Sequence, residues 1–152
     1  MRIIALQGKH DTGKTTTLNK LIDLLENHEF FCCEKILDEG GGDGERRCWA
    51  TSSGVKIGIT TRGDAEECLY ADFFGKPPNF KDRDIVVCAI RTYGGTETFV
   101  RKYGNDGLLI HGRWYLEGSQ DMDIKRSYTH QAQAEAILEE IMDYIKEREA
   151  SQ

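Results

Sequence analysis

The chain has 152 residues, of which 39% are hydrophobic and 30% are charged, the balance of an ordinary globular domain. This length suits one domain over residues 1–152 and leaves little room for a second. A formal net charge of −6 argues against a general nucleic-acid binder, unless Arg46, Arg47 and Arg62 gather in a local basic patch.

Neither a membrane segment nor an export signal is recognisable in the sequence. No window reaches the roughly 18 apolar residues that a transmembrane helix needs, and the N-terminus leads directly into an apolar strand. The five cysteines are odd in number and lack the short paired spacing of structural zinc sites. We therefore expect a cytoplasmic protein with reduced thiols and no membrane partner.

The first predicted elements are a strand, a glycine loop and a helix. The apolar run IIAL at residues 3–6 is typical of a buried parallel strand. Residues 8–15 read GKHDTGKT and fit the pattern G-x-x-x-x-G-K-S/T at each constrained position. Apolar residues then recur at helical spacing until His28, so a helix should start near Gly13. These three elements in this order predict a phosphate-binding loop.

The chemistry of this loop suits a nucleotide. Its backbone N–H groups and the positive end of the helix dipole would surround phosphate oxygens. Lys14 should bridge the β- and γ-phosphates, and the Thr15 hydroxyl should bind Mg²⁺. Asp11 would repel phosphate unless it orients a water or a hydroxyl, so it is a candidate base. The residues expected to bind the nucleotide are Gly8, Lys9, His10, Asp11, Thr12, Gly13, Lys14, Thr15 and Thr16.

On these residues the chain resembles the P-loop NTPase superfamily, closely over residues 1–28 and at the level of the fold over most of the rest. The resemblance implies a three-layer α/β sandwich that binds ATP or GTP with Mg²⁺. The sequence contains no motif that resembles a known reader of adenine or guanine. ATP is therefore preferred only because it is the commoner ligand.

Two groups within this superfamily share part of the loop. Thymidylate-kinase-like loops carry an acid one place earlier than Asp11. The deviant Walker A ATPases have a lysine at the position of Lys9, which in that group reaches the nucleotide of a partner subunit. Here His10 and Asp11 stand in place of two glycines of that motif. The second resemblance, which is partial, implies a homodimer.

The middle of the chain reads as mainly extended. Residues 30–37 should be a strand, and the glycine-rich, charged stretch 38–47 should be a mobile surface loop. Two strand-like segments flank Ser53–Gly54, a pair suited to a tight turn, so residues 47–61 should form an antiparallel hairpin. A helix from Asp64 to about Phe74 follows.

The second half of the chain alternates strands with helices. Residues 84–91, DIVVCAIR, should be a central strand, followed by a helix at 96–103 and a strand at 108–116. Thr129 should cap a long final helix. This alternation predicts an α/β fold with a mainly parallel sheet and helices on both faces. In such sheets, ligands bind at the carboxyl ends of the strands.

Asp64 is the best candidate for the acid that phosphoryl transfer needs near Mg²⁺, because it follows the strand that ends near Thr61. Asp64 also begins a capping-box pattern with Glu67, so a purely structural role stays open. Lys14, Asp64, Asp11 and Arg91 are the residues expected to carry the chemistry, with Thr15 and Asp64 on the metal.

Arginines at strand ends are candidates for stabilising charge on the transferred phosphoryl group. Arg91 and Arg62 fit this role, although each would also suit an ion pair with a surface carboxylate. Arg113 follows a later strand and is a weaker candidate. His111 is better explained as a packed, hydrogen-bonded residue than as a catalyst.

Three functions fit the sequence. The first is a kinase that transfers phosphate to a small-molecule or nucleotide acceptor, and the second is a hydrolysing NTPase. The third is a nucleotide sensor or partner-binding module without catalysis, in which the glycine-rich loop would become ordered on binding. The acceptor and the choice between these functions are open at the level of sequence.

Overall fold

The computed structural model describes residues 1–8, 13–39, 44–112 and 122–152, with residues 122–128 described as helix backbone. Its described residues form an α/β fold of one six-stranded mixed sheet and four helices. The elements in chain order are β1 (Arg2–Gln7), α1 (Lys14–Glu26), β2 (Cys32–Glu39), β3 (Glu45–Ser52), β4 (Val55–Thr60), α2 (Glu66–Phe74), β5 (Ile85–Ile90), α3 (Thr96–Tyr103), β6 (Leu108–Gly112) and α4 (Met122–Ala150).

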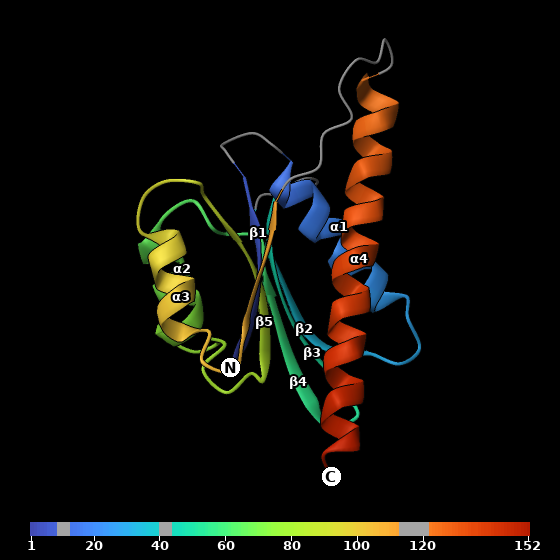
Figure 1. The fold of residues 1–152 in the computed structure, drawn as a ribbon. Helices are drawn as coiled ribbons and strands as arrows, with labels where there is room; N and C mark the ends of the chain where they lie inside the picture. Colours follow the sequence, from blue (N-terminus) through green and yellow to red (C-terminus); the bar gives the residue numbers. More distant parts are fainter. Residues whose placement is uncertain (9–12, 40–43, 113–121) are drawn as a thin grey trace.

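The strand order in the sheet is β2-β3-β4-β5-β1-β6. Strands β4, β5, β1 and β6 run parallel to one another, while β2 and β3 are antiparallel additions at one side. Helices α1 and α4 cover one face of the sheet, and α2 and α3 cover the other (Figure 1). The predicted α/β class with a mainly parallel sheet is confirmed.

Two apolar cores fill the space between the sheet and its helices. Ile4 and Leu6 point toward α1 and α4, whereas Ile3 and Ala5 point toward α2 and α3. Every residue of β5 is buried. Because parallel strands covered on both faces read as continuous apolar runs, β1 and β5 were predictable from the sequence.

The predicted hairpin at residues 47–61 is confirmed. Strands β3 and β4 pair from Arg47 with Thr60 to Ser52 with Val55. Ser53 and Gly54 have φ values of 51° and 78°. Two-residue hairpin turns of type I′ need positive φ at both central positions, and glycine adopts it without steric cost.

The predicted loop at residues 38–47 is shorter than expected. Strand β2 continues to Glu39 and β3 begins at Glu45, and residues 40–43 lie outside the described residues. The pairing is stabilised by opposite charges across the two strands, Arg46 Nε with Asp38 Oδ1 at 2.8 Å and Arg47 Nη2 with Glu39 Oε1 at 2.8 Å. At the other end, β2 starts at Cys32 rather than at residue 30.

The last helix begins earlier than predicted. Thr129 lies inside α4 and is buried, so it is not the N-cap. Residues 122–128 contain neither Gly nor Pro, so nothing in the sequence stops the helix before Thr129. The predicted strand at 108–116 is confirmed as far as Gly112, and the expected continuation lies outside the described residues. Within the part that the structure describes, no helix is long and apolar enough to cross a membrane.

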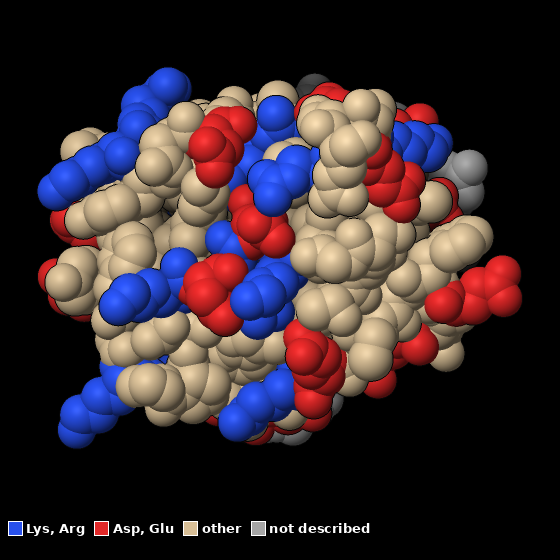
Figure 2. Space-filling view, turned by 90° about the horizontal axis from the view of Figure 1, so that it is seen from below, with Lys and Arg blue, Asp and Glu red and all other residues tan. Residues whose placement is uncertain are grey.

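The end of the molecule where β1 starts carries interleaved charges of both signs (Figure 2). The Met1 ammonium pairs with Asp106, and Arg2 Nη1 lies 3.2 Å from Glu147 Oε2. Arg148 Nη2 lies 3.5 Å from Asp84 Oδ1. These ion pairs join both ends of the chain to the sheet.

Candidate functional site

The carboxyl ends of β1 and β5 lie side by side, and the connections that leave them go to opposite faces of the sheet. The segment after β1 enters α1, and the segment after β5 enters α3 (Figure 1). In open α/β sheets, such a reversal creates a crevice at the strand ends, which is the usual ligand site. The sequence therefore places its glycine loop at the strand end that this fold favours for binding.

Lys14 is held at these strand ends by backbone carbonyls. Its Nζ donates to Gly8 O at 2.7 Å and to Ile90 O at 3.0 Å, and the side chain is only 8% exposed. The Gly8 N–H also donates to Ile90 O, at 3.2 Å. These carbonyls satisfy the buried ammonium and hold its positive charge between the ends of β1 and β5.

Gly13 makes the turn into α1 possible. It has φ 84° and ψ 22° at the N-cap of the helix, a left-handed conformation that glycine adopts without steric cost. Helix α1 begins at Lys14, as predicted, and Thr15 and Thr16 occupy its first turn. Lys9, His10, Asp11 and Thr12 lie outside the described residues, so the roles predicted for them stay predictions.

Arg91 and Asp64, predicted separately, form an ion pair at the same edge. Arg91 Nη2 lies 3.2 Å from Asp64 Oδ1, and Arg91 Nη1 donates to the Tyr93 hydroxyl at 2.9 Å. The hydrogen bond with Asp64 raises the pKa of Arg91, so the guanidinium stays charged. The Arg91 Nε–H is buried, and no described residue accepts a hydrogen bond from it.

Gly63 brings Asp64 to this position. A Cβ atom on Gly63 would overlap the carbonyl oxygen of Ala89, so the backbone after β4 packs directly against the end of β5. The predicted capping role of Asp64 is wrong, because Ala65 is the N-cap of α2 and no side chain caps that helix. The Asp64 carboxylate pairs with Arg91 instead.

Of the two roles left open for Arg62, the structure shows the ion pair with carboxylates. Its Nη1 lies 3.6 Å from both Asp72 Oδ1 and Glu39 Oε1, and Arg47 contacts the same two carboxylates. Arg46 lies near three further acids, Asp23, Glu26 and Asp38. The open suggestion of a basic patch is wrong, because each of these arginines is neutralised locally.

The structure adds one acid that the sequence reasoning missed. Glu45 starts β3, and its carboxylate accepts a hydrogen bond from the Thr61 hydroxyl at 2.6 Å. Burial raises the pKa of Glu45; the Thr61 hydrogen bond opposes that rise and the Asp64 charge adds to it. No sequence signal marked Glu45, because it lies in the glycine-rich stretch that reads as loop.

His111 and Arg113 were predicted at the end of β6. His111 Nε2 lies 2.9 Å from Glu140 Oε1 on α4, which agrees with the expected hydrogen-bonded role. Arg113 lies outside the described residues. Among the residues that the structure describes, no group of three or more His, Cys, Asp or Glu side chains could hold a metal ion. All five cysteines are free thiols.

Comparisons with protein-family models, with curated proteins and with solved structures found no match to this chain.

Proposed function

We propose that the chain binds Mg·ATP or Mg·GTP through residues 8–16 and belongs to the P-loop NTPases. The observation that carries the proposal is the anchoring of the Lys14 ammonium on Gly8 O and Ile90 O beside a left-handed Gly13. Loop, lysine and helix N-terminus then provide the N–H groups and the charge that a triphosphate requires. Thr15 would supply the hydroxyl ligand to Mg²⁺.

We further propose phosphoryl transfer, either to a small-molecule acceptor or to water. Asp64 and Arg91 support this part, because an acid and a guanidinium at the strand edge are the groups that assist phosphoryl transfer. Asp64 would bind Mg²⁺ directly or through water, and Arg91 would stabilise charge on the transferred group. Asp11 would act as the base if its carboxylate faces the attacking hydroxyl.

A nucleotide sensor is the second candidate, and a specific observation favours it. The Asp64 carboxylate, 63% exposed, is already paired with Arg91, and β4 itself ends at Thr60. A strand end without a directly attached, unpaired acid is what a non-catalytic nucleotide-binding module would show.

Isothermal titration of Mg·ATP and Mg·GTP into the wild type and Lys14→Ala tests the binding. Loss of the charge-assisted hydrogen bonds from lysine to phosphate should weaken affinity about 10- to 100-fold. Lys20→Ala, on the same helix, is the matched control and should bind like the wild type. Absence of binding to the wild type, or equal binding by Lys14→Ala, would refute the proposal.

Phosphate release from the tighter nucleotide then separates the reactions. Steady release by the wild type supports hydrolysis. Release that depends on an added acceptor supports a kinase, and binding without any turnover supports a sensor.

A further inference from the structure

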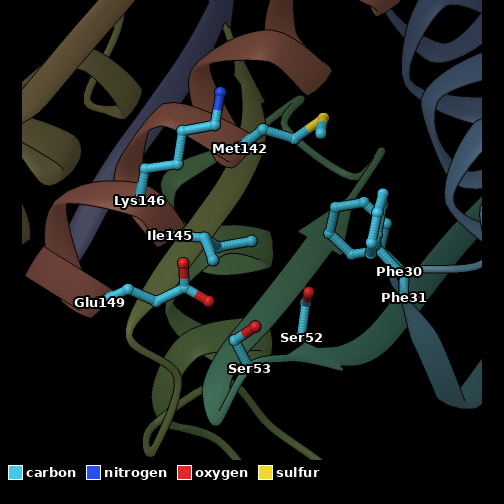
Figure 3. A pocket seen from close by; sticks show the side chains of 8 residues that line it. All are labelled: Phe30, Phe31, Ser52, Ser53, Met142, Ile145, Lys146 and Glu149. Atoms are coloured by element: carbon cyan, nitrogen blue, oxygen red, sulfur yellow. The ribbon is translucent and has the colours of Figure 1, made fainter.

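A hollow of about 280 Å³ lies beside the last part of α4 (Figure 3), at the opposite end of the molecule from the start of α1 (Figure 1). Its walls come from the turn before β2, the turn between β3 and β4, and the last part of α4. Phe31, Met142 and Ile145 give it an apolar lining. The hollow shares no residue with the proposed nucleotide site.

Phe30 lines this hollow as well and is 65% exposed (Figure 3). The side chain packs on His28, with ring centroids 5.2 Å apart, but leaves most of its surface to solvent. Burying a phenyl group of this kind gains about 1.5–3 kcal/mol. A cavity of about 150 Å³ admits a benzene ring, so the hollow has room for the phenyl group of another molecule.

Two charged residues of α4 flank the same hollow. Lys146 and Glu149 both lie on its α4 side (Figure 3), and neither forms an ion pair with any other residue that the structure describes. An isologous interface needs a patch that complements itself. A largely exposed ring at the rim of a ring-sized hollow, with one lysine and one glutamate on the same rim, meets this condition.

We propose that this surface binds a second copy of the chain about a two-fold axis. Phe30 of each copy enters the hollow of the other, and Lys146 of each copy faces Glu149 of its partner. The proposal is independent of the proposed function, since it would hold if the chain bound no nucleotide.

This dimer differs from the one implied by the partial resemblance at Lys9. The hollow lies at the start of β2 and the end of α4, whereas β1 ends and α1 begins at the other end of the parallel strands (Figure 1). The starts of the two α1 helices would therefore lie at the far ends of the dimer, and Lys14 of one copy would be remote from Lys14 of the other.

Sedimentation velocity over a wide range of protein concentrations tests the proposal. The wild type should show a monomer–dimer equilibrium, and Phe30→Asp should weaken the dimer by at least about 30-fold, as expected for a central aromatic anchor. Phe30 is largely exposed, so the fold should tolerate the change, which circular dichroism can verify. Tyr70→Asp on α2, where the ring is 55% exposed, is the matched control and should leave the dimer intact.

Charge reversal makes the test specific to the two-fold arrangement. Lys146→Glu and Glu149→Lys should each weaken the dimer about 10-fold, because each places like charges together at two symmetric positions. The double variant restores opposite charges and should recover the wild-type affinity. Lys76 is exposed and does not line the hollow, so Lys76→Glu should have no effect.

Three outcomes would overturn the proposal. The first is a wild type that remains monomeric at every concentration. The second is a dimer that survives Phe30→Asp or fails to recover in the double charge variant. The third is a monomer whose hollow takes up a small apolar dye, with uptake lost in Phe30→Asp, which would assign the hollow to a small ligand.

Discussion

Asp72 is a buried carboxylate, and mutation can separate the contribution of its charge to stability from that of its hydrogen bonds. It lies on α2 with 1% of its side chain exposed, and the Thr60 hydroxyl donates to its Oδ2 at 2.7 Å. Guanidinium nitrogens of Arg47 and Arg62 lie 3.5 and 3.6 Å from its Oδ1. Burial raises the pKa of Asp72, although the Thr60 hydrogen bond and both arginines oppose the rise.

Asp72→Asn should cost little stability at neutral pH. The amide oxygen of the asparagine can face the two guanidiniums while its N–H donates to Thr60 Oγ1, so only the Thr60 O–H loses its acceptor. The raised pKa means that the fold favours a neutral carboxyl over a charged one at this place. We expect a loss of less than about 1 kcal/mol at pH 7.

Asp72→Ala should cost much more, because nothing replaces the lost oxygens. The Thr60 hydroxyl and two partly buried guanidiniums would lose their partner together. Removing one member of a buried charged network costs about 3–5 kcal/mol. Glu39 still contacts both arginines, and their side chains are 15% and 24% exposed, so we expect the lower end, about 3 kcal/mol.

The contribution of Asp72 to folding stability should change with pH in a defined direction. A carboxyl whose folded pKa is raised contributes stability that is fully present below its unfolded value of 3.8. That contribution is lost as the pH rises through the higher folded pKa. The wild type should therefore lose stability relative to Asp72→Asn as the pH increases from about 4 toward neutrality.

Urea unfolding of the three proteins between pH 4 and 8 measures these differences directly. In the difference between the unfolding free energies of the wild type and Asp72→Asn, the contributions of titratable groups that both proteins share cancel. If the wild type instead gained stability over Asp72→Asn with rising pH, the ion pairs would outweigh burial and the reasoning would fail. Equal losses in Asp72→Asn and Asp72→Ala would contradict it as well.

Two further predictions concern the packing around β5. Gly63→Ala should lower the free energy of unfolding by about 2–3 kcal/mol, since its Cβ would overlap the Ala89 carbonyl; Gly112→Ala, with open space at its Cβ position, is the control, and equal effects in a urea titration would contradict the account. Burial raises the pKa of Cys88 to about 12, so at pH 8 a maleimide should label the exposed Cys32 while Cys88 stays protected until unfolding. Peptide mass spectrometry measures the labelling of each cysteine, and equal labelling rates for Cys32 and Cys88 in the folded protein would refute this prediction.

The parts of the fold that were predictable are those in which local pattern and tertiary position agree. The runs at residues 3–6 and 85–90 are apolar throughout because the strands are covered on both faces. The hairpin was predictable from Ser53–Gly54, because its two-residue turn requires positive φ at these positions and the residue types there permit it. The turn into α1 was predictable for the same reason, because Gly13 adopts a left-handed conformation that favours glycine.

The parts that were missed depend on partners distant in the sequence. The pairing of Asp38 with Arg46 extends β2 and β3 into a stretch whose glycines and charges read as loop. Glu45 became a site candidate only through its contact with Thr61. Local spacing left a capping role open for Asp64, but its carboxylate pairs with Arg91 from the end of another strand.

The ion pair between Asp64 and Arg91 makes the two predicted roles dependent on each other. Only Oδ1 of Asp64 contacts Arg91, at 3.2 Å, so Mg²⁺ at Oδ2 would leave the ion pair intact, whereas Mg²⁺ at Oδ1 would displace the guanidinium. If Mg²⁺ takes Oδ1, Arg91 keeps its hydrogen bond with Tyr93 and gains an unpaired charge beside the end of β5. That charge would then face whatever phosphate lies on the loop. Metal binding at Asp64 Oδ1 and phosphate binding at Arg91 should therefore strengthen each other, whereas without nucleotide each residue holds the other in place.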